Sequence, residues 1–190
     1  MRVSVFIGIA LVALAGCSHN LHGDFSTYLY QHPGTLEKID AKTGYTIERG
    51  TQEYVYEYNT ASTATAVRWV VNVGDMLKDY LNGYVRDSFQ SFEYDPDRLK
   101  YPLNIEFNVL SYKIESFRAM VDMRIVVHER DVLVLDKKYS AQGQTQPGKM
   151  VFGTVFSQRL AVHQSTQYAF DAIMKSFLSD VKGFVSAMPQ

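Results

Sequence analysis

Apolar and polar residues alternate in three stretches of the first third of the chain, at residues 27–31, 44–48 and 52–58. Alternation with a period of two is the pattern of a half-buried β-strand. In the third stretch, Tyr54, Tyr56 and Tyr58 fall on one face of the expected strand. A short turn at 49–51 separates the second and third stretches. The pattern therefore predicts a strand at 27–31 and a hairpin over 44–58.

Alternation returns between residues 103 and 141, where Leu103, Ile105, Phe107 and Val109 begin a second group of strands. Two further alternating stretches follow, at 117–127 and 132–141, and only a few residues separate each from the one before. Connections this short join antiparallel neighbours, because a parallel pair needs a long crossover. The sequence thus predicts a three-strand antiparallel meander.

Two other segments carry apolar residues every three or four positions, which is the stripe of an amphipathic helix. One runs from about Thr65 to Asp95, where Pro96 disfavours further helix. The second runs from Phe156 to Phe184, and its stripe weakens at 163–167. We expect an α+β fold: an antiparallel sheet of hairpin plus meander, packed against two long amphipathic helices in a two-layer sandwich. Because no linker interrupts residues 27–190, they are expected to form a single domain.

The amino terminus has a different character. Residues 3–15 form a small-apolar run that is too short to span a bilayer but suits the central region of an export signal. The run ends in Leu14, Ala15, Gly16 and Cys17, which resemble the lipobox of bacterial lipoproteins, where the cysteine is acylated and becomes the mature amino terminus. The resemblance implies a signal peptide over 1–16 and a lipidated Cys17 that opens a polar tether over 17–26.

Cys17 is the single cysteine of the chain, so the expected covalent lipid, palmitate among its acyl chains, accounts for the thiol. The alternative is an uncleaved signal anchor with Cys17 inside the membrane. Ser18 follows the cysteine in place of the aspartate that resembles an inner-membrane retention signal. We therefore expect attachment to the outer membrane on its periplasmic face.

Charge and motifs exclude several functions. The 190 residues carry 19 Lys and Arg against 20 Asp and Glu, and this near-neutral balance argues against a nucleic-acid partner. The sequence contains no nucleophile elbow, zinc-protease helix, Walker loop or dinucleotide fingerprint. His19 and His22 have loose metal-ligand spacing but lie in the expected tether, and the carboxylate pair Asp95 and Asp97 lies in turn-like sequence. We expect no enzyme, no metal site and no cofactor besides the lipid.

Two aromatic sets are candidate docking surfaces. Tyrosine is enriched at interfaces, so Tyr28, Tyr30, Tyr54, Tyr56 and Tyr58 are one candidate, with packing at the edge of the core as the alternative. A row of three phenylalanines on the last helix is the other, either lining a groove for a lipid chain or partner helix or filling the core. That row consists of Phe170, Phe177 and Phe184.

In the order of its elements, the chain resembles the ABC-transport auxiliary (PqiC-like) lipoproteins and the YajG-type lipoproteins. The likeness rests on the lipobox, the Tyr-Leu-Tyr-Gln stretch at 28–31, the meander that begins Leu103-Asn104-Ile105-Glu106-Phe107, and the closing helix. It implies a non-enzymatic accessory that docks onto envelope lipid-transport machinery through a protein partner. The alternative is a structural or regulatory lipoprotein that contacts peptidoglycan or a cell-wall synthase. The sequence favours no particular oligomeric state.

Overall fold

The computed structural model describes residues 18–61, 66–145 and 155–185. Its elements, in chain order, are β1 (Ser18–Asn20), η1 (His22–Asp24), α1 (Phe25–Gln31), β2 (Ile39–Ile47), α2 (Arg49–Gln52), β3 (Val55–Ala61), β4 (Ala66–Asn72), α3 (Val73–Tyr80), η2 (Leu81–Val85), η3 (Arg86–Ser88), β5 (Phe89–Tyr94), β6 (Leu103–Glu115), β7 (Arg118–Glu129), β8 (Val132–Gln142) and α4 (Val155–Val185).

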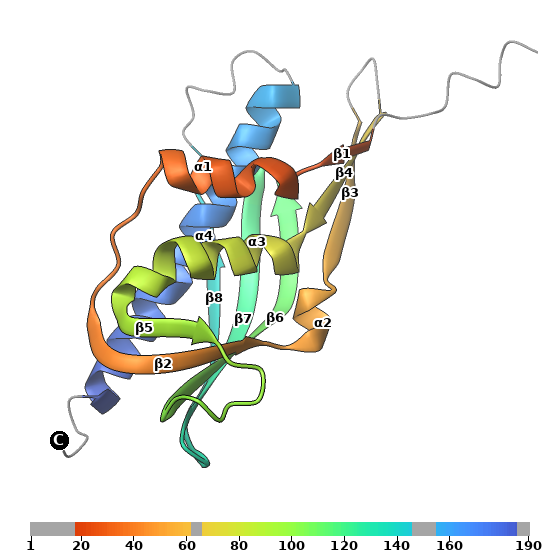
Figure 1. The fold of residues 1–190 in the computed structure, drawn as a ribbon. Helices are drawn as coiled ribbons and strands as arrows, with labels where there is room; N and C mark the ends of the chain where they lie inside the picture. Colours follow the sequence, from red (N-terminus) through yellow and green to blue (C-terminus); the bar gives the residue numbers. More distant parts are fainter. Residues whose placement is uncertain (1–17, 62–65, 146–154, 186–190) are drawn as a thin grey trace, which may run out of the picture.

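The strands form two sheets. The larger is five-stranded, in the order β5-β2-β6-β7-β8, and β2 is parallel to both of its neighbours. The smaller is three-stranded, in the order β1-β4-β3, and stands at one end of the molecule (Figure 1). Helix α4 packs along β7 and β8, while α1 contacts both α3 and α4. The helices and the inner face of the larger sheet enclose one core.

This architecture corrects the expected fold class. The fold is α+β, but the main sheet is mixed, not antiparallel, and among the described residues only α4 is a long helix. A parallel pair needs a long crossover. Here the connection from β2 to β5 spans residues 48–88 and contains the whole hairpin of the smaller sheet. The pattern of apolar and polar residues within one strand carries no information on which distant strand pairs with it in the sheet.

The meander prediction is confirmed. Strands β6, β7 and β8 pair antiparallel in sequence order, from Leu103↔Glu129 through Glu115↔Arg118 and on to Met120↔Gln142. The turn between β6 and β7 consists of Ser116 and Phe117, with φ of 50° and 61°. A two-residue hairpin turn with both φ values positive matches the twist of the strands that it joins.

The helix predicted from Thr65 to Asp95 is wrong: β4, α3, a π-helical turn (η2), a 3-10 turn (η3) and β5 occupy that segment in succession. Within β4, Trp69 and Val71 are buried while Arg68 is exposed, so the true period there is two. Over seven residues, an alternating pattern and a helical stripe share several positions, which explains the error. The π-helical turn then displaces the stripe by one residue before β5 begins.

The predicted strand at 27–31 is also wrong, since these residues belong to α1. Phe25, Tyr28 and Leu29 are the buried residues of α1, and their spacing of three and four is helical. The hairpin over 44–58 does not form either, because β2 and β3 belong to different sheets. Between them the Glu48 side chain accepts a hydrogen bond from Thr51 N at 3.0 Å and caps the single turn of α2, which turns the chain out of the larger sheet.

The predicted helix over 156–184 is confirmed by α4. Phe170 and Phe177 are fully buried, and the Phe177 ring meets those of Phe107 and Tyr139 edge to face at 6.0 and 6.2 Å. Phe184, near the carboxyl end of the helix, is 39% exposed. The first two phenylalanines are thus core residues, in agreement with the alternative to a groove.

The fold begins earlier than the expected tether allows. Cys17 lies outside the described residues, but Ser18, directly after it, pairs with Arg68 as the first residue of β1. Leu21 and Phe25 are fully buried, and Leu21 N donates to Val70 O at 3.0 Å. Residues 18–26, which we expected to form a polar tether, are therefore an integral part of the domain.

Candidate functional site

The five tyrosines predicted as a docking surface do not share one face. Tyr28 is buried on α1, whereas Tyr30 on the same helix is 89% exposed. Tyr54, Tyr56 and Tyr58 are half-buried and share one side of their stretch, as the alternation predicted. Their rings pack against the core, so the edge-of-core alternative describes these three tyrosines.

Two hydroxyl groups of this row, those of Tyr54 and Tyr56, bond the edge of the larger sheet at β6. Strand β2 ends at Ile47, and no other strand of the described residues pairs with the second half of β6 on that side. Tyr112 N donates to the Tyr54 hydroxyl at 3.2 Å, and Ile114 N donates to the Tyr56 hydroxyl at 3.4 Å. Val109 N donates to Thr51 Oγ1 at 2.8 Å. Side chains thus satisfy the backbone donors of an edge that would otherwise be open to another strand.

The weak part of the α4 stripe is a belt of buried polar groups. His163 Nε2 donates to Leu21 O at 2.7 Å, and Ser165 Oγ accepts from Ala119 N at 2.8 Å. Thr166 Oγ1 bonds the hydroxyl of Tyr112 at 2.7 Å. Each bond reaches a different element, so the belt fixes the position of α4 along the core. Burial lowers the pKa of His163 to about 4.

Asp95, one of the other candidate ligands, serves local structure. The carboxylate of Asp95 accepts from Lys100 N at 2.9 Å and organises the loop before β6, which is the turn role expected of it. No group of three or more potential metal ligands occurs in the part of the chain that the structure describes. The lipobox residues Leu14, Ala15, Gly16 and Cys17 lie outside the described residues.

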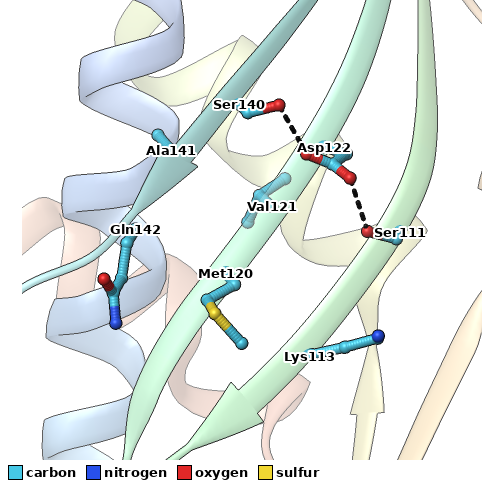
Figure 2. A pocket seen from close by; sticks show the side chains of 8 residues that line it. All are labelled: Ser111, Lys113, Met120, Val121, Asp122, Ser140, Ala141 and Gln142. Atoms are coloured by element: carbon cyan, nitrogen blue, oxygen red, sulfur yellow. Dashed lines mark hydrogen bonds between the residues drawn. The ribbon is translucent and has the colours of Figure 1, made fainter.

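A pocket of about 370 Å³ lies over β6, β7 and β8. Figure 2 shows Asp122 at its upper end, between the hydroxyl groups of Ser111 and Ser140, with Met120, Lys113 and Gln142 below. Ser111 Oγ donates to Asp122 at 3.1 Å and Ser140 Oγ at 2.5 Å, and Lys138 Nζ lies 3.2 Å from the same carboxylate. These side chains point away from the core, so they form part of the outer face of the sheet.

The electrostatics of this face suit binding more than proton transfer. The hydrogen bond from Ser140, with those from Lys138 and Ser111, lowers the pKa of Asp122, so its carboxylate stays ionised. Next along β7, Arg124 donates to both carboxylate oxygens of Asp136, at 2.7 and 2.6 Å. A carboxylate that already accepts three hydrogen bonds is a poor base. It organises a polar rim around the apolar surface of Met120.

Sequence reasoning missed this surface, although its strands were predicted. In the observed register Ser111 pairs with Asp122, and Asp122 with Ser140, so three polar outward positions form one row across the sheet. This row of polar positions can be recognised only once the register of the strands is known. A bulge between Val109 and Ser111 sets that register, and no feature of the alternating pattern identifies it.

No helix within the described residues is both long and apolar enough to cross a bilayer. No known family model matches the chain, and no curated protein matches it in sequence. Among solved structures, it is similar to protein XCC0632 from Xanthomonas campestris, assigned to family DUF330, with a TM-score of 0.52 and 10% identity over 80% of this chain and 91% of that one. The hypothetical protein CT253 from Chlamydia trachomatis covers 47% of this chain and 58% of its own length, with 11% identity and a TM-score of 0.34. The likeness to XCC0632 is one of fold.

Proposed function

We propose that this chain is a lipoprotein of the outer membrane, facing the periplasm, and that it acts as a non-enzymatic docking component of envelope lipid-transport machinery. The proposal is supported by the lipobox-like end of the apolar run, by the lack of catalytic motifs in the sequence and by a fold shared with XCC0632. Cys17 is the anchor, through its covalent lipid. The outer face of β6, β7 and β8 around Met120 is the docking surface.

The observation that carries this proposal is the closeness of Cys17 to the fold. Strand β1 begins at the next residue, and Leu21, four positions after the cysteine, is fully buried. An acyl chain on Cys17 would therefore hold the domain close to the membrane, because no long linker separates the cysteine from the first strand. The carboxyl end of β6 lies at the same end of the molecule as β1 (Figure 1). The pocket over β6–β8 would then face a partner close to the membrane surface.

Replacing Cys17 with serine is expected to leave export intact and to remove the protein from the membrane fraction. Each buried methylene of an acyl chain contributes roughly 0.8 kcal/mol, so the loss of all the chains removes the main attachment. Fractionation of cells that express the variant, followed by separation of inner and outer membranes, measures the change. Ser18→Ala is the control, and it should stay with the outer membrane. A C17S protein recovered in the membrane at the wild-type level would contradict the anchor.

The docking surface is tested by a photo-crosslinking residue placed at Met120, in cells that carry the full lipoprotein. We expect a discrete adduct with a component of an envelope lipid-transport system. The same residue at Ser179, exposed on α4 behind the sheet, is the control and should give no such adduct. An adduct at position 120 with a cell-wall synthase would contradict the transport role and favour the alternative function.

A further inference from the structure

A second pocket, of about 330 Å³, lies between α1 and α4, on the helical side of the larger sheet. Pockets that take small ligands begin at about 300 Å³, so its size suits a compact molecule. Its lining combines aromatic, amide and carboxylate side chains: Tyr28, His32, Pro33, Gly34, Leu160, Gln164, Gln167, Tyr168 and Asp171.

Asp171 is the charged group of this pocket. Its carboxyl is half-buried, and Oδ1 accepts a hydrogen bond from the Tyr80 hydroxyl at 2.7 Å. Burial raises the pKa of Asp171, against the lowering effect of that bond and of the Lys175 charge. None of the ion pairs found among the described residues includes Asp171, although the positive charge of Lys175, one turn further along α4, acts on it. A desolvated carboxylate with one hydrogen bond is stabilised by any cation that enters beside it.

Two tyrosine rings line the same space. Tyr28 and Tyr168 both line the pocket, and the Tyr28 ring stacks on His32 with centroids 4.3 Å apart. His32 Nδ1 must donate to Tyr28 O, 2.9 Å away, because a carbonyl oxygen only accepts. The faces of tyrosine rings carry negative charge density and attract cations within about 6 Å. Rings and carboxylate thus favour the same kind of ligand.

The wall of the pocket is held in place before any ligand arrives. Gln167 Nε2 donates to the Tyr84 hydroxyl at 2.7 Å and to His32 O at 3.1 Å. Both amide hydrogens are therefore used in holding the wall. Gly34 lies so close to the Tyr84 ring that a Cβ atom there would stand 2.4 Å from it. A fixed wall lowers the entropic cost of binding.

From this arrangement we infer that the pocket between α1 and α4 binds a small organic cation that carries a primary or quaternary ammonium group. The ammonium pairs with the Asp171 carboxylate and contacts the exposed ring of Tyr168, while Tyr28, whose ring is buried and stacked on His32, forms part of the wall. Anionic ligands are disfavoured by the same carboxylate. The inference does not depend on the proposed docking role, because it uses neither Cys17 nor the outer face of the sheet.

Binding is measured by calorimetry and by thermal unfolding, on the full lipoprotein in a maltoside detergent that carries no ammonium group. The probes are choline, ethanolamine and 3,3-dimethylbutanol, which has the shape of choline without its charge. Choline or ethanolamine should bind and raise the unfolding temperature, since a ligand of the native state stabilises it. The uncharged analogue should do neither. Equal binding of choline and the uncharged analogue, or no binding by either amine, would overturn the inference.

Two variants locate the site. Asp171→Asn keeps an oxygen for Tyr80 and should weaken binding about tenfold or more, as expected for loss of a charged contact. Tyr168→Leu should weaken it severalfold, and because Tyr168 is 40% exposed this change leaves the core intact. Asp131→Asn, the same change at an exposed turn outside the pocket, is the matched control. Wild-type affinity in both D171N and Y168L would refute the assignment.

A final binding experiment distinguishes two sources of the ammonium group, a lipid headgroup and a free amine. Short-chain phosphatidylethanolamine is compared with free ethanolamine, and short-chain phosphatidylglycerol serves as the lipid control. Tighter binding of the ethanolamine lipid than of free ethanolamine supports the site with a headgroup as its ligand. Binding of free ethanolamine alone supports the site with a soluble amine as its ligand.

Discussion

Replacing Gly143 with alanine is expected to lower the free energy of unfolding by about 3 kcal/mol or more, the upper part of the range for overpacked sites. A Cβ atom on Gly143 would stand 1.8 Å from the backbone oxygen of Ser165 and 2.4 Å from its Oγ. Neither atom can move easily, because Ser165 lies in the middle of α4 and its Oγ accepts from Ala119 N. Gly143 N also donates to Ala119 O at 2.8 Å, so β7, β8 and α4 meet here.

The measurement is urea unfolding followed by circular dichroism. The matched control is Gly183→Ala, since the space around Gly183 on α4 is open within 4 Å. That change should leave stability unaltered or raise it by up to about 1 kcal/mol, because alanine is the better helix former. If G143A unfolded at the same urea concentration as the wild type, the close contact of β8 with α4 would be refuted.

The contact at Gly143 illustrates which features a sequence pattern reveals and which it does not. The strands β6, β7 and β8 and the helix α4 follow from period and loop length, because each of these elements is long and regular. That α4 packs against the glycine directly after β8 follows from neither. The alternating tyrosines at 54, 56 and 58 were placed on one side correctly, but the hydrogen bonds of the Tyr54 and Tyr56 hydroxyls to the β6 edge depend on β2 ending at Ile47.

The polar run 163–167 is the clearest case of a feature that the sequence pattern does not reveal. In the sequence it reads as a weak part of an apolar stripe, since polar side chains are usually exposed. In the fold His163, Ser165, Thr166 and Gln167 are all buried, and each bonds a different element. Buried polar groups need partners, and those partners come from segments far away in the chain. The candidate site around Asp171 was missed for the same reason, because α1, α3 and α4 each supply part of it.

Acid is expected to destabilise the domain through one member of that run. The pKa of His163 is about 4 in the fold and about 6.5 in the unfolded chain, chiefly because burial disfavours the charged ring. Above pH 6.5 both states hold the ring neutral, and below pH 4 both hold it protonated. Between these values the unfolded chain binds the extra proton, so the free energy of unfolding falls as the pH falls. The full effect is about 3 kcal/mol.

Urea unfolding at pH values from 7 down to 4.5 measures this loss. His163→Gln keeps a donor for Leu21 O but does not titrate, so its stability should depend less on pH than that of the wild type. Exposed His32 changed to Gln is the control, and it should retain the wild-type dependence. Asp171 has the opposite effect on the free energy of unfolding, because its raised pKa makes the folded state bind more protons as the pH falls. All three proteins contain Asp171, so its contribution cancels when their pH dependences are compared.

The His163 effect is tied to one place in the fold. The ring sits against Phe25 and Tyr28, with centroids 5.5 and 5.7 Å away, and its nearest charged neighbours are Arg159 and Asp24. Its acceptor, Leu21 O, belongs to the segment that follows Cys17. The destabilisation therefore acts where the chain enters the domain, and the protection of the β1 and η1 amides, relative to their intrinsic exchange rates at each pH, should fall between pH 6.5 and 4.5 in the wild type. If protection there fell equally in H163Q, the titration would belong to another group.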